Sequence, residues 1–376
     1  MTQTAPSSPD TTYMQLAIDL AKKGHYTTSP NPRVGCVIVK NGAVVGQGYH
    51  QKAGEPHAEV YAMREAGAKA EGATAYVTLE PCSHYGRTPP CALGLINAKV
   101  AKVVIAMVDP NPQVSGRGIA MLEEAGIEVV SGVLEQAARA LNVGFIHLME
   151  TKRPFIRCKL AASLDGKTAM QSGESKWITG EAARIDVQHY RAQSCAVLTS
   201  ATSVIEDNAK MNVRYEQLGE VQNVYPQEQL RQPVRIILDS RNRLSPDLAL
   251  FHSNSPIIII GTDLENIHQW PHFVEHIALK GEPGRIDLEE VITTLASRGY
   301  NDILVEAGAN LAGAFIEQNL INELILYQAP KLLGGDGRNL VEMPSISKLV
   351  DTKKLTISEL TMVGDDIKIV ATLNEN

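Results

Sequence analysis

Apolar and polar positions along residues 10–150 alternate in short runs that predict a layered α/β fold. After Asp10 or Thr11, apolar residues at helical spacing predict a helix that runs to about Lys23. The apolar run at 34–39 and the turn Asn41-Gly42 predict a β-hairpin that returns through 43–49. Further helices are predicted over 57–68, 91–98, 118–125 and 135–141, and further strands over 73–79, 102–108 and 127–130. A hairpin followed by strands joined through helices is typical of an α/β/α sandwich.

The second half of the chain alternates strands and helices again. Strands are predicted over 155–162, 196–199, 234–238, 257–261, 303–305, 323–328, 355–362 and 367–373, and helices over 181–193, 288–298 and 309–318. This order predicts an α/β domain with a mostly parallel sheet that ends in a hairpin at Gly364-Asp365-Asp366. The polar, glutamine-rich segment 215–231 is predicted to be a surface loop.

A chain of 376 residues is long for a single hydrophobic core. The helical stretch 142–150 is followed by Thr151-Lys152-Arg153-Pro154 and then by a strand, which indicates a boundary. We therefore expect a flexible tail over 1–9, a first domain over 10–150 and a second domain over 151–376.

The amino-acid composition argues against some classes of binding partner and indicates the cellular compartment. The net charge of -7 argues against a nucleic-acid or anionic-membrane partner, although one or two local cations would suffice for a single phosphate. Five cysteines in a chain of this length do not resemble a disulfide framework, so a reducing compartment is expected. Residues 2–9 lack the features of a signal peptide, and the longest aliphatic run, 257–260, is too short to span a bilayer. These features predict a cytoplasmic protein.

A histidine, a glutamate and two cysteines in the first domain predict a hydrolytic zinc site. His57 and Cys91 begin two predicted helices, and Cys82 follows a predicted strand. Helix N-termini and a cation both favour thiolate over thiol. Three ligands leave a fourth position for water, and Glu59 is close enough to His57 to exchange protons with that water. The competing interpretations are buried core thiols and a structural zinc, which needs no unligated carboxylate.

Polar residues of the second domain gather after the predicted strands, where open α/β sheets bind ligands. A glycine-containing turn after 303–305 opens a helix and could hold a phosphate, although most such turns are ordinary caps. The sequence has no complete Gly-x-Gly-x-x-Gly in this context, so an ordinary Rossmann dehydrogenase is not supported.

Longer motifs of the first domain point to a known family. The segment from Pro81-Cys82 to Pro90-Cys91 has eight residues between its cysteines, where many zinc deaminases have two. With Asn31-Pro32-Arg33-Val34-Gly35, Gly48-Tyr49-His50 and Asp109-Pro110-Asn111-Pro112, it resembles the deaminase domain of the bifunctional riboflavin-biosynthesis deaminase/reductases. The resemblance implies a cytidine-deaminase-like fold and zinc-dependent release of ammonia from a diaminopyrimidine ribosyl phosphate.

The same resemblance suggests substrate contacts for the deaminase: Asn31, His50, Arg87 and Asn111. An amide offers a heterocycle both a donor and an acceptor, and a guanidinium matches a phosphate, which makes Arg87 the candidate phosphate ligand. Asn31 and Asn111 could instead be turn residues beside proline, Arg87 a solvated charge, and His50 a surface histidine.

The second domain resembles the reductase half of the same family. The matching motifs are Lys159 to Lys167, Trp177-Ile178-Thr179-Gly180, Asp207-Asn208 through Arg214, and Glu306-Ala307-Gly308. The resemblance implies a dihydrofolate-reductase-like fold and NADPH-dependent reduction of a ribosyl to a ribityl group. It places Ala161, Trp177, Ser203, Asp207, Ser240 and Gly308 against NADPH. It places Ser175, Arg191, Met211, Arg214 and Glu306 against the substrate, with both arginines on the substrate phosphate. Lys159, Asp207 and Glu306 are the ionisable candidates beside hydride transfer, and the proton donor among them stays open.

Three functions therefore compete. The first is the bifunctional deaminase/reductase acting on phosphorylated pyrimidines, for which the family also suggests a homo-oligomer. The second is a zinc deaminase of another base with a passive second domain. The third is a zinc-stabilised interaction module without activity, which would give Glu59 no role.

Overall fold

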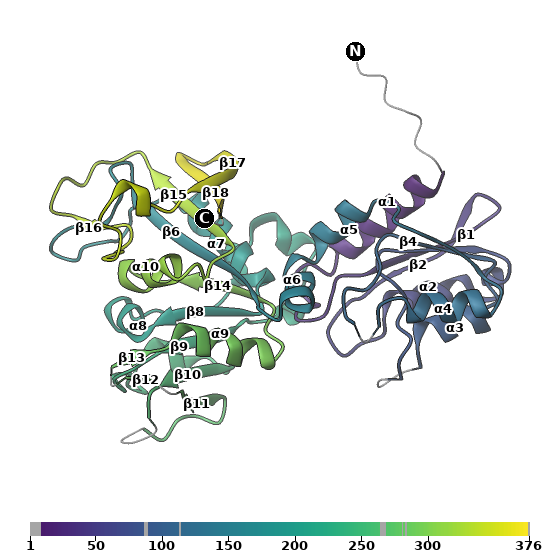
Figure 1. Cartoon of the computed structure of the whole chain (residues 1–376), viewed down its shortest axis with the longest axis horizontal. Coiled ribbons are helices and arrows are strands. Elements are labelled where there is room, and N and C mark those ends of the chain that lie inside the picture. Colours follow the sequence, from purple (N-terminus) through teal and green to yellow (C-terminus); the bar gives the residue numbers. More distant parts are fainter. Residues whose placement is uncertain are drawn as a thin grey trace, which may run out of the picture. The chain divides into compact units, whose positions relative to one another are not determined.

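A computed structural model describes residues 9–85, 89–112, 114–263, 268–279, 281–282 and 284–374. The chain divides into two compact units, residues 1–152 and residues 153–376 (Figure 1). The expected boundary at 150/151 falls at the end of helix α6 (Val143–Thr151), two residues before this division. Within the described ranges, no helix is long and apolar enough to cross a membrane.

The first unit is built on a five-stranded sheet with the order β2-β1-β3-β4-β5. Its strands are β1 (Gly35–Lys40), β2 (Ala43–Tyr49), β3 (Thr74–Val77), β4 (Lys102–Ile105) and β5 (Glu128–Ser131). The predicted hairpin is confirmed, because β1 and β2 pair antiparallel across Asn41 and Gly42, both with positive φ. The pairs β3–β4 and β4–β5 are parallel.

Helices cover both faces of this sheet (Figure 1). The helices of the first unit are α1 (Pro9–Lys22), α2 (Ala58–Ala66), α3 (Cys91–Asn97), α4 (Arg117–Glu124), α5 (Glu135–Leu141) and α6, with a 3₁₀ turn at Gly67–Ala70. Helices α2, α3 and α4 pack with Cys36 and Ile38 on one face, and α1 and α5 pack with Val37 and Val39 on the other. The strand alternation therefore buries both faces, which confirms the α/β/α sandwich.

Glycines in β2 let helix α2 lie directly on the backbone of the sheet. A Cβ atom at Gly46 would lie 2.2 Å from the Ala62 carbonyl oxygen, and one at Gly48 would lie 2.5 Å from the Ala58 carbonyl oxygen. No side chain fits at either position, so the first turns of α2 are held at backbone contact distance.

The second unit contains a nine-stranded sheet with the order β11-β10-β9-β8-β14-β6-β15-β18-β17. Its strands are β6 (Phe155–Ser163), β8 (Ala196–Ser200), β9 (Val234–Leu238), β10 (Ile257–Gly261), β11 (Val274–Ala278), β14 (Asp302–Glu306), β15 (Glu323–Ala329), β17 (Leu355–Val363) and β18 (Asp366–Leu373). Strands from β11 to β15 are parallel, and β18 and β17 complete the sheet antiparallel. The mostly parallel sheet and its closing hairpin are confirmed.

Helices again cover both faces of the large sheet. They are α7 (Glu181–Gln193), α8 (Ala201–Asp207), α9 (Leu288–Ser297) and α10 (Ala309–Glu317). One face packs Ile156, Cys158 and Leu160 of β6 against α9 and α10. The opposite face carries α7 and α8, so the alternate β6 residue Lys159 faces the α7 side.

The structure adds short elements that the pattern did not predict. These are α8, β7 (Lys167–Ala169), β11, β12 (Gly281–Glu282), β13 (Arg285–Ile286) and β16 (Arg338–Asn339). The prediction of a plain surface loop over 215–231 was incomplete. The segment forms three 3₁₀ turns and buries Leu218 and Tyr225.

Candidate functional site

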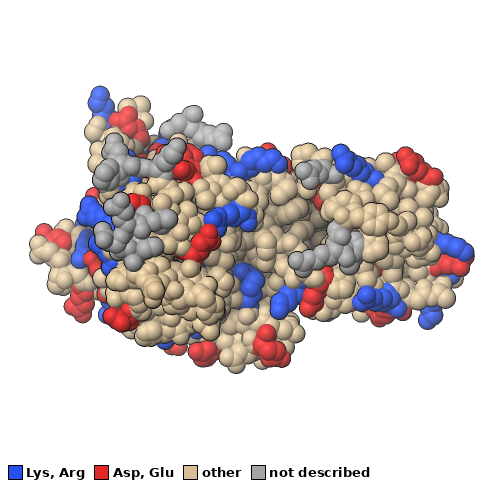
Figure 2. Space-filling view, turned by 90° about the horizontal axis from the view of Figure 1, so that it is seen from below, with Lys and Arg blue, Asp and Glu red and all other residues tan. Residues whose placement is uncertain are grey.

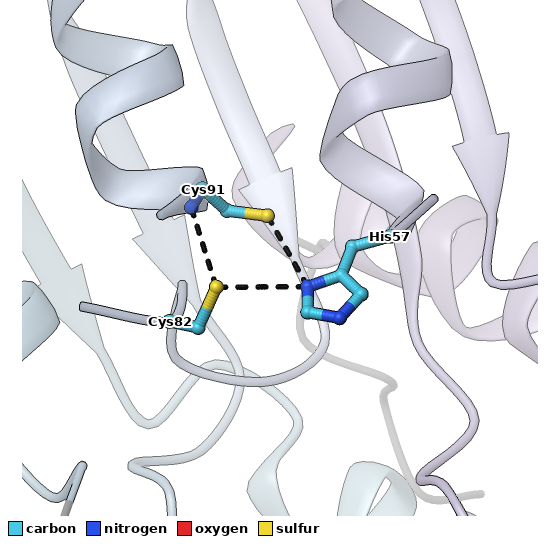
Figure 3. A group of neighbouring side chains, drawn as sticks. All are labelled: His57, Cys82 and Cys91. Atoms are coloured by element: carbon cyan, nitrogen blue, oxygen red, sulfur yellow. Dashed lines mark hydrogen bonds between the residues drawn. The ribbon is translucent and has the colours of Figure 1, made fainter. Parts of the chain in front are cut away.

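His57, Cys82 and Cys91 converge in the first unit, as the spacing predicted. The Nδ1 atom of His57 lies 3.6 Å from Cys82 Sγ and 3.3 Å from Cys91 Sγ, and the backbone N–H of Cys91 donates to Cys82 Sγ (Figure 3). The three ligand atoms lie within 4.8 Å of one another. Tetrahedral zinc with typical Zn–S and Zn–N bonds would place such ligands about 3.6 Å apart, so the donor set fits this metal.

Helix starts position the cluster. His57 is the N-cap residue of α2 rather than a residue of its first turn, and Cys91 is the first residue of α3. Cys82 follows β3 on the turn that delivers Glu80 and Pro81. The positive ends of two helices therefore face the sulfur atoms, which favours thiolate.

The pKa values of the three ligands indicate how the cluster would bind a cation. Hydrogen bonding from Cys91, with a further contribution from His57, lowers the pKa of Cys82 to about 4. The same hydrogen bond and burial raise the pKa of Cys91, and the hydrogen bond with Cys82 raises the pKa of His57 to about 9. At neutral pH the cluster alone holds one thiolate, and metal binding would release the protons of the other two ligands.

Glu59 lies in the first turn of α2, where the sequence placed the proton-transfer group. Its side chain is 3% exposed, and its Oε2 atom has no hydrogen-bond partner among the described residues. Burial raises the pKa of its carboxyl group, while the His57 charge opposes the rise. A buried carboxylate oxygen without a partner is costly unless a ligand or water completes it.

Two of the four predicted deaminase contacts touch each other. Asn31 Nδ2 donates to His50 Nε2 at 3.3 Å, and His50 Nδ1 donates to the Pro56 carbonyl oxygen at 3.1 Å. His50 is therefore buried and neutral in its Nδ1–H form, and burial lowers its pKa. It is not the surface histidine of the competing interpretation.

Of the other two predicted contacts, Asn111 lies in the described part of the structure and Arg87 does not. Asn111 lies in the loop after β4, where its backbone N–H donates to Asp109 Oδ1 at 2.8 Å. Arg87 lies outside the described residues. Sequence reasoning missed Glu80, whose buried carboxylate ties this loop to the turn before Cys82. The only sequence signal for it was its place beside Pro81-Cys82.

The second unit contains a cavity of about 1480 Å³ at the carboxyl ends of its central strands. This exceeds the roughly 300–1,000 Å³ typical of a pocket for one small ligand, so it has room for two ligands. All but one of the predicted reductase residues line it: Lys159, Ala161, Ser175, Trp177, Arg191, Ser203, Asp207, Met211, Arg214, Glu306 and Gly308.

Positive charge gathers at the cavity although the chain as a whole is acidic. Its lining contains seven lysines and arginines but four aspartates and glutamates, whereas the full chain has a net charge of -7. Sequence reasoning did not assign four of these cations, which are Lys176, Arg184, Lys210 and Arg338. Arg184 lies 4.5 Å from the centre of the Trp177 ring, and Arg338 pairs with Glu206. A cationic cavity of this kind suits phosphorylated ligands.

Arg191 is engaged with another predicted residue rather than standing free. Its guanidinium donates to both carboxylate oxygens of Glu306, at 2.5 and 3.0 Å, and to the Asn212 carbonyl oxygen. Burial alone would raise the pKa of Glu306, but the Arg191 charge outweighs it and the pKa is lowered. Burial lowers the pKa of the neighbouring Lys159, and Glu306 opposes this shift.

The guanidinium of Arg214 makes fewer hydrogen bonds to the described protein groups than that of Arg191. Its Nη1 atom donates to Gln217 Oε1 at 3.2 Å, while its backbone N–H donates to Gln188 Oε1. Met211, three residues earlier, is buried with φ of 54°, a backbone conformation that is strained for a side chain of this size. Such strain in a cavity wall is typical of segments that place a ligand contact.

Two of the predicted cofactor contacts, Ser203 and Gly308, lie at neighbouring helix starts, whereas Ala161 lies in β6 and Asp207 is the last residue of α8. Ser203 lies in the first turn of α8 and Gly308 is the N-cap of α10, and a Cβ atom at Gly308 would lie 3.9 Å from Ser203 Oγ. Trp177 is 62% exposed at the cavity rim. Ser240 is the exception: it does not line the cavity, and its hydroxyl donates to the Gly284 carbonyl oxygen.

Comparisons with known proteins cover both units. Residues 154–369 match the family model "RibD C-terminal domain", and residues 7–107 match "Cytidine and deoxycytidylate deaminase zinc-binding region". The riboflavin biosynthesis protein RibD of Haemophilus influenzae is 52% identical over 97% of this chain and 98% of its own length. Its counterpart in Escherichia coli is 51% identical over 95% and 98%.

Solved structures agree with these matches. Acinetobacter baumannii RibD, form 1, superposes with a TM-score of 0.89 at 44% identity, covering 98% of this chain and 99% of that one. A Thermotoga maritima diaminohydroxyphosphoribosylaminopyrimidine deaminase/5-amino-6-(5-phosphoribosylamino)uracil reductase superposes with a TM-score of 0.85 at 34% identity, covering 97% and 99%.

Proposed function

Because the chain belongs to the RibD family of riboflavin biosynthesis proteins, a family of bifunctional deaminases and reductases, we propose which of its residues carry each activity. Zinc and NADPH are the cofactors of the two reactions. We assign the deaminase reaction to 2,5-diamino-6-(5-phosphoribosylamino)pyrimidin-4-one and the NADPH-dependent reduction to its deaminated product. The observation that carries the assignment is the buried Oε2 atom of Glu59, which has no hydrogen-bond partner in the described part of the chain and belongs to the helix that His57 caps.

Glu59 transfers the protons of the deamination. His57, Cys82 and Cys91 would hold the zinc ion, which when bound would supply an activated water as nucleophile. Glu59 accepts a proton from this water and returns protons to the ring nitrogen and to the leaving amine, for which its raised pKa suits it. Asn31, His50, Asn111 and Arg87 bind the pyrimidine and its phosphate. A structural zinc would need no buried carboxylate with an oxygen left for a proton, as Glu59 has among the described residues.

The second unit binds NADPH and the ribosyl substrate together. NADPH supplies the hydride that reduces the ribosyl group. Gly308 lies at the start of α10, whose N–H groups suit the cofactor phosphates, and the Ser203 hydroxyl lies close to Gly308. Arg214 binds the substrate phosphate, while Arg191 orients Glu306 beside Lys159. Lys159, Glu306 and Asp207 are the groups that can hold or deliver a proton there.

Charge and cysteine chemistry support the choice of substrate and compartment. On the face drawn in Figure 2, basic and acidic side chains are interspersed rather than gathered into an extended basic surface, which suits a small phosphorylated substrate better than a polynucleotide. All five cysteines lie in the described part of the chain and none of them forms a disulfide bond, which supports a reducing, cytoplasmic setting.

A second copy of the chain is the partner we propose for strand β17. This edge strand exposes Leu355, Ile357, Leu360 and Met362, the last two by 64% and 63%. An exposed apolar edge strand pairs readily with another chain. Leu360→Lys should shift the protein from dimer to monomer in analytical ultracentrifugation, whereas a wild type that sediments as a monomer would refute the proposal.

The pair of activities can be tested with one substrate. The diaminopyrimidine phosphate should release ammonia without NADPH, and NADPH should be oxidised only after ammonia has been released. Glu59→Gln protein should oxidise NADPH when given the deaminated phosphate but not when given the diaminopyrimidine. Ammonia release without any NADPH oxidation would favour a passive second unit.

A further inference from the structure

Glu80 is a second buried glutamate beside the metal cluster, and its surroundings are the reverse of those of Glu59. It is 3% exposed and lies two residues before Cys82. Its Oε2 atom accepts from the backbone N–H groups of Asp109 and Gly116, at 3.1 and 3.0 Å. Its Oε1 atom accepts from those of Gly118 and Ile119, at 2.9 and 3.3 Å. Four backbone donors therefore satisfy one carboxylate.

The four donors come from both ends of one loop. Asp109 begins the loop that follows β4, and Gly116 ends it as the N-cap of α4. Oε2 bridges these two ends, and Oε1 binds the first residues of α4, where the helix dipole favours an anion. Asn111 lies between the bridged ends, and its carbonyl oxygen accepts from the N–H groups of Val114 and Ser115.

The same glutamate is fixed to the metal-ligand turn. Its backbone N–H donates to the Met107 carbonyl oxygen at 3.0 Å. A Cβ atom on Gly118 would lie 2.0 Å from the Pro81 carbonyl oxygen, so the start of α4 lies directly on the residue between Glu80 and Cys82. The Asn111 loop and the Cys82 turn are thus clamped to each other through one side chain.

We propose that Glu80 is a positioning residue of the deaminase, which holds the Asn111 loop at a fixed distance from the metal cluster. It touches neither metal nor substrate, and acts on substrate binding through Asn111. The proposal rests on the assignment of Asn111 as a pyrimidine contact. No other kind of side chain can replace it in full, because only a carboxylate offers two acceptor oxygens to two pairs of donors.

Glu80→Gln removes half of the clamp with little change in shape. An amide has one acceptor oxygen, so one pair of N–H groups loses its acceptor whichever way the amide is turned. We expect the KM for the diaminopyrimidine phosphate to rise about 10–100-fold, the range typical of residues that orient a metal site from behind its ligands. The kcat per bound zinc, the zinc content and NADPH oxidation with the deaminated substrate should stay near those of the wild type.

The control is Glu124→Gln, which removes the same charge from the exposed end of the same helix. It should leave the KM unchanged. A purely structural role for Glu80 would lower the zinc content and the amount of folded protein without changing the KM, and that result would overturn the proposal. If Glu80→Gln does not fold, Glu80→Asp keeps the charge but is too short to reach both pairs of donors, and the same rise in KM is expected.

The variant Asn111→Ala tests the assignment of Asn111 as a pyrimidine contact separately from the positioning role of Glu80. If Glu80 acts through Asn111, the double variant should have the KM of Asn111→Ala alone. If the KM of the double variant instead rises by the product of the two separate increases, that coupling is overturned. If Asn111→Ala leaves the KM unchanged while Glu80→Gln raises it, Asn111 is rejected as a substrate contact and Glu80 still positions the loop. An unchanged KM in Glu80→Gln overturns the proposal whatever Asn111 does.

Discussion

The metal cluster of the first unit and the cavity of the second hold their charged groups in opposite ways. In the cluster, three ligand atoms converge within 4.8 Å and Glu59 presents an oxygen without a partner among the described residues. In the cavity, Arg191 and Glu306 satisfy each other through two hydrogen bonds. The first site directs an unshared carboxylate oxygen at its ligands, whereas the second pairs Arg191 with Glu306 in a space wide enough for two ligands.

This difference shows which effects each reaction needs from the protein. Hydrolysis at a metal requires one proton-transfer group at a fixed place. For Glu59, the group that we propose, the free-energy cost of this readiness is one buried oxygen without a hydrogen bond to any described residue. Hydride transfer requires two ligands to be brought together in one cavity. The ion pair between Arg191 and Glu306 gives each of these two buried charges a partner within the protein itself. Removing a single group should therefore have different consequences at the two sites.

The largest effect is expected from Glu59→Gln. The amide cannot accept a proton, so ammonia release should fall by about 10²–10⁴-fold, the usual contribution of general acid–base catalysis. The zinc content should stay at the wild-type level because Glu59 is not a ligand. Colorimetric ammonia release and metal analysis measure the two quantities, and full activity in this variant would remove Glu59 from the mechanism.

The second effect is the pH dependence of zinc binding. In the metal-free cluster the pKa of His57 is about 9 and that of Cys91 is raised, so both are protonated at neutral pH, while Cys82, with a pKa of about 4, is not. Binding should release two protons, and the apparent affinity should fall about 100-fold for each unit by which the pH is lowered between 8 and 6.

Competition with a chelator across this pH range measures the slope. A tenfold change per unit would mean that one of the two ligands is already deprotonated without metal. The reductase activity of the same samples serves as the control, because the cavity contains none of the three ligands.

The smallest effects are expected from replacing Arg191 and Arg214 in the cavity, and the two variants should differ in which property changes. Arg214→Ala should raise the KM for the phosphorylated reductase substrate about tenfold or more with little loss of stability, because Arg214 is weakly tied to the protein. Arg191→Ala should lower the stability of the second unit by about 3–5 kcal/mol, because it leaves Glu306 buried without a partner. Steady-state kinetics and thermal unfolding distinguish the two, and equal effects of both variants on stability would contradict this division.

Local signals made the metal site predictable from sequence. Each of His57, Cys82 and Cys91 is placed by a nearby helix start or strand end, so the pattern of elements brought them together. The hairpin at Asn41-Gly42 was predictable for the same reason, because both residues favour positive φ. Most of the parallel strands followed from runs of apolar residues that only a sheet buried on both faces requires, whereas the partly exposed edge strand β11 has no such run and was missed.

Pairings between distant residues could not be predicted in this way. Arg191 and Glu306 are 115 residues apart, and nothing near either one indicates that they satisfy each other. Glu80 meets donors 29 to 39 residues further along the chain, and these are backbone groups that carry no residue signature. Helix α8 was missed because its seven residues, rich in small and polar types, read as a turn after the strand.

The glycines of β2 have a consequence for how the protein tolerates change. A helix supported by side chains shifts by tenths of an ångström when a neighbour in the core is exchanged. Helix α2 is instead seated on Gly46 and Gly48, so its height above the sheet is set by peptide units, whose dimensions are nearly constant. His57 and Glu59 stand at the beginning of that helix. An engineer could therefore redesign the apolar side chains beneath the other helices and still find His57 and Glu59 at their original height above the sheet.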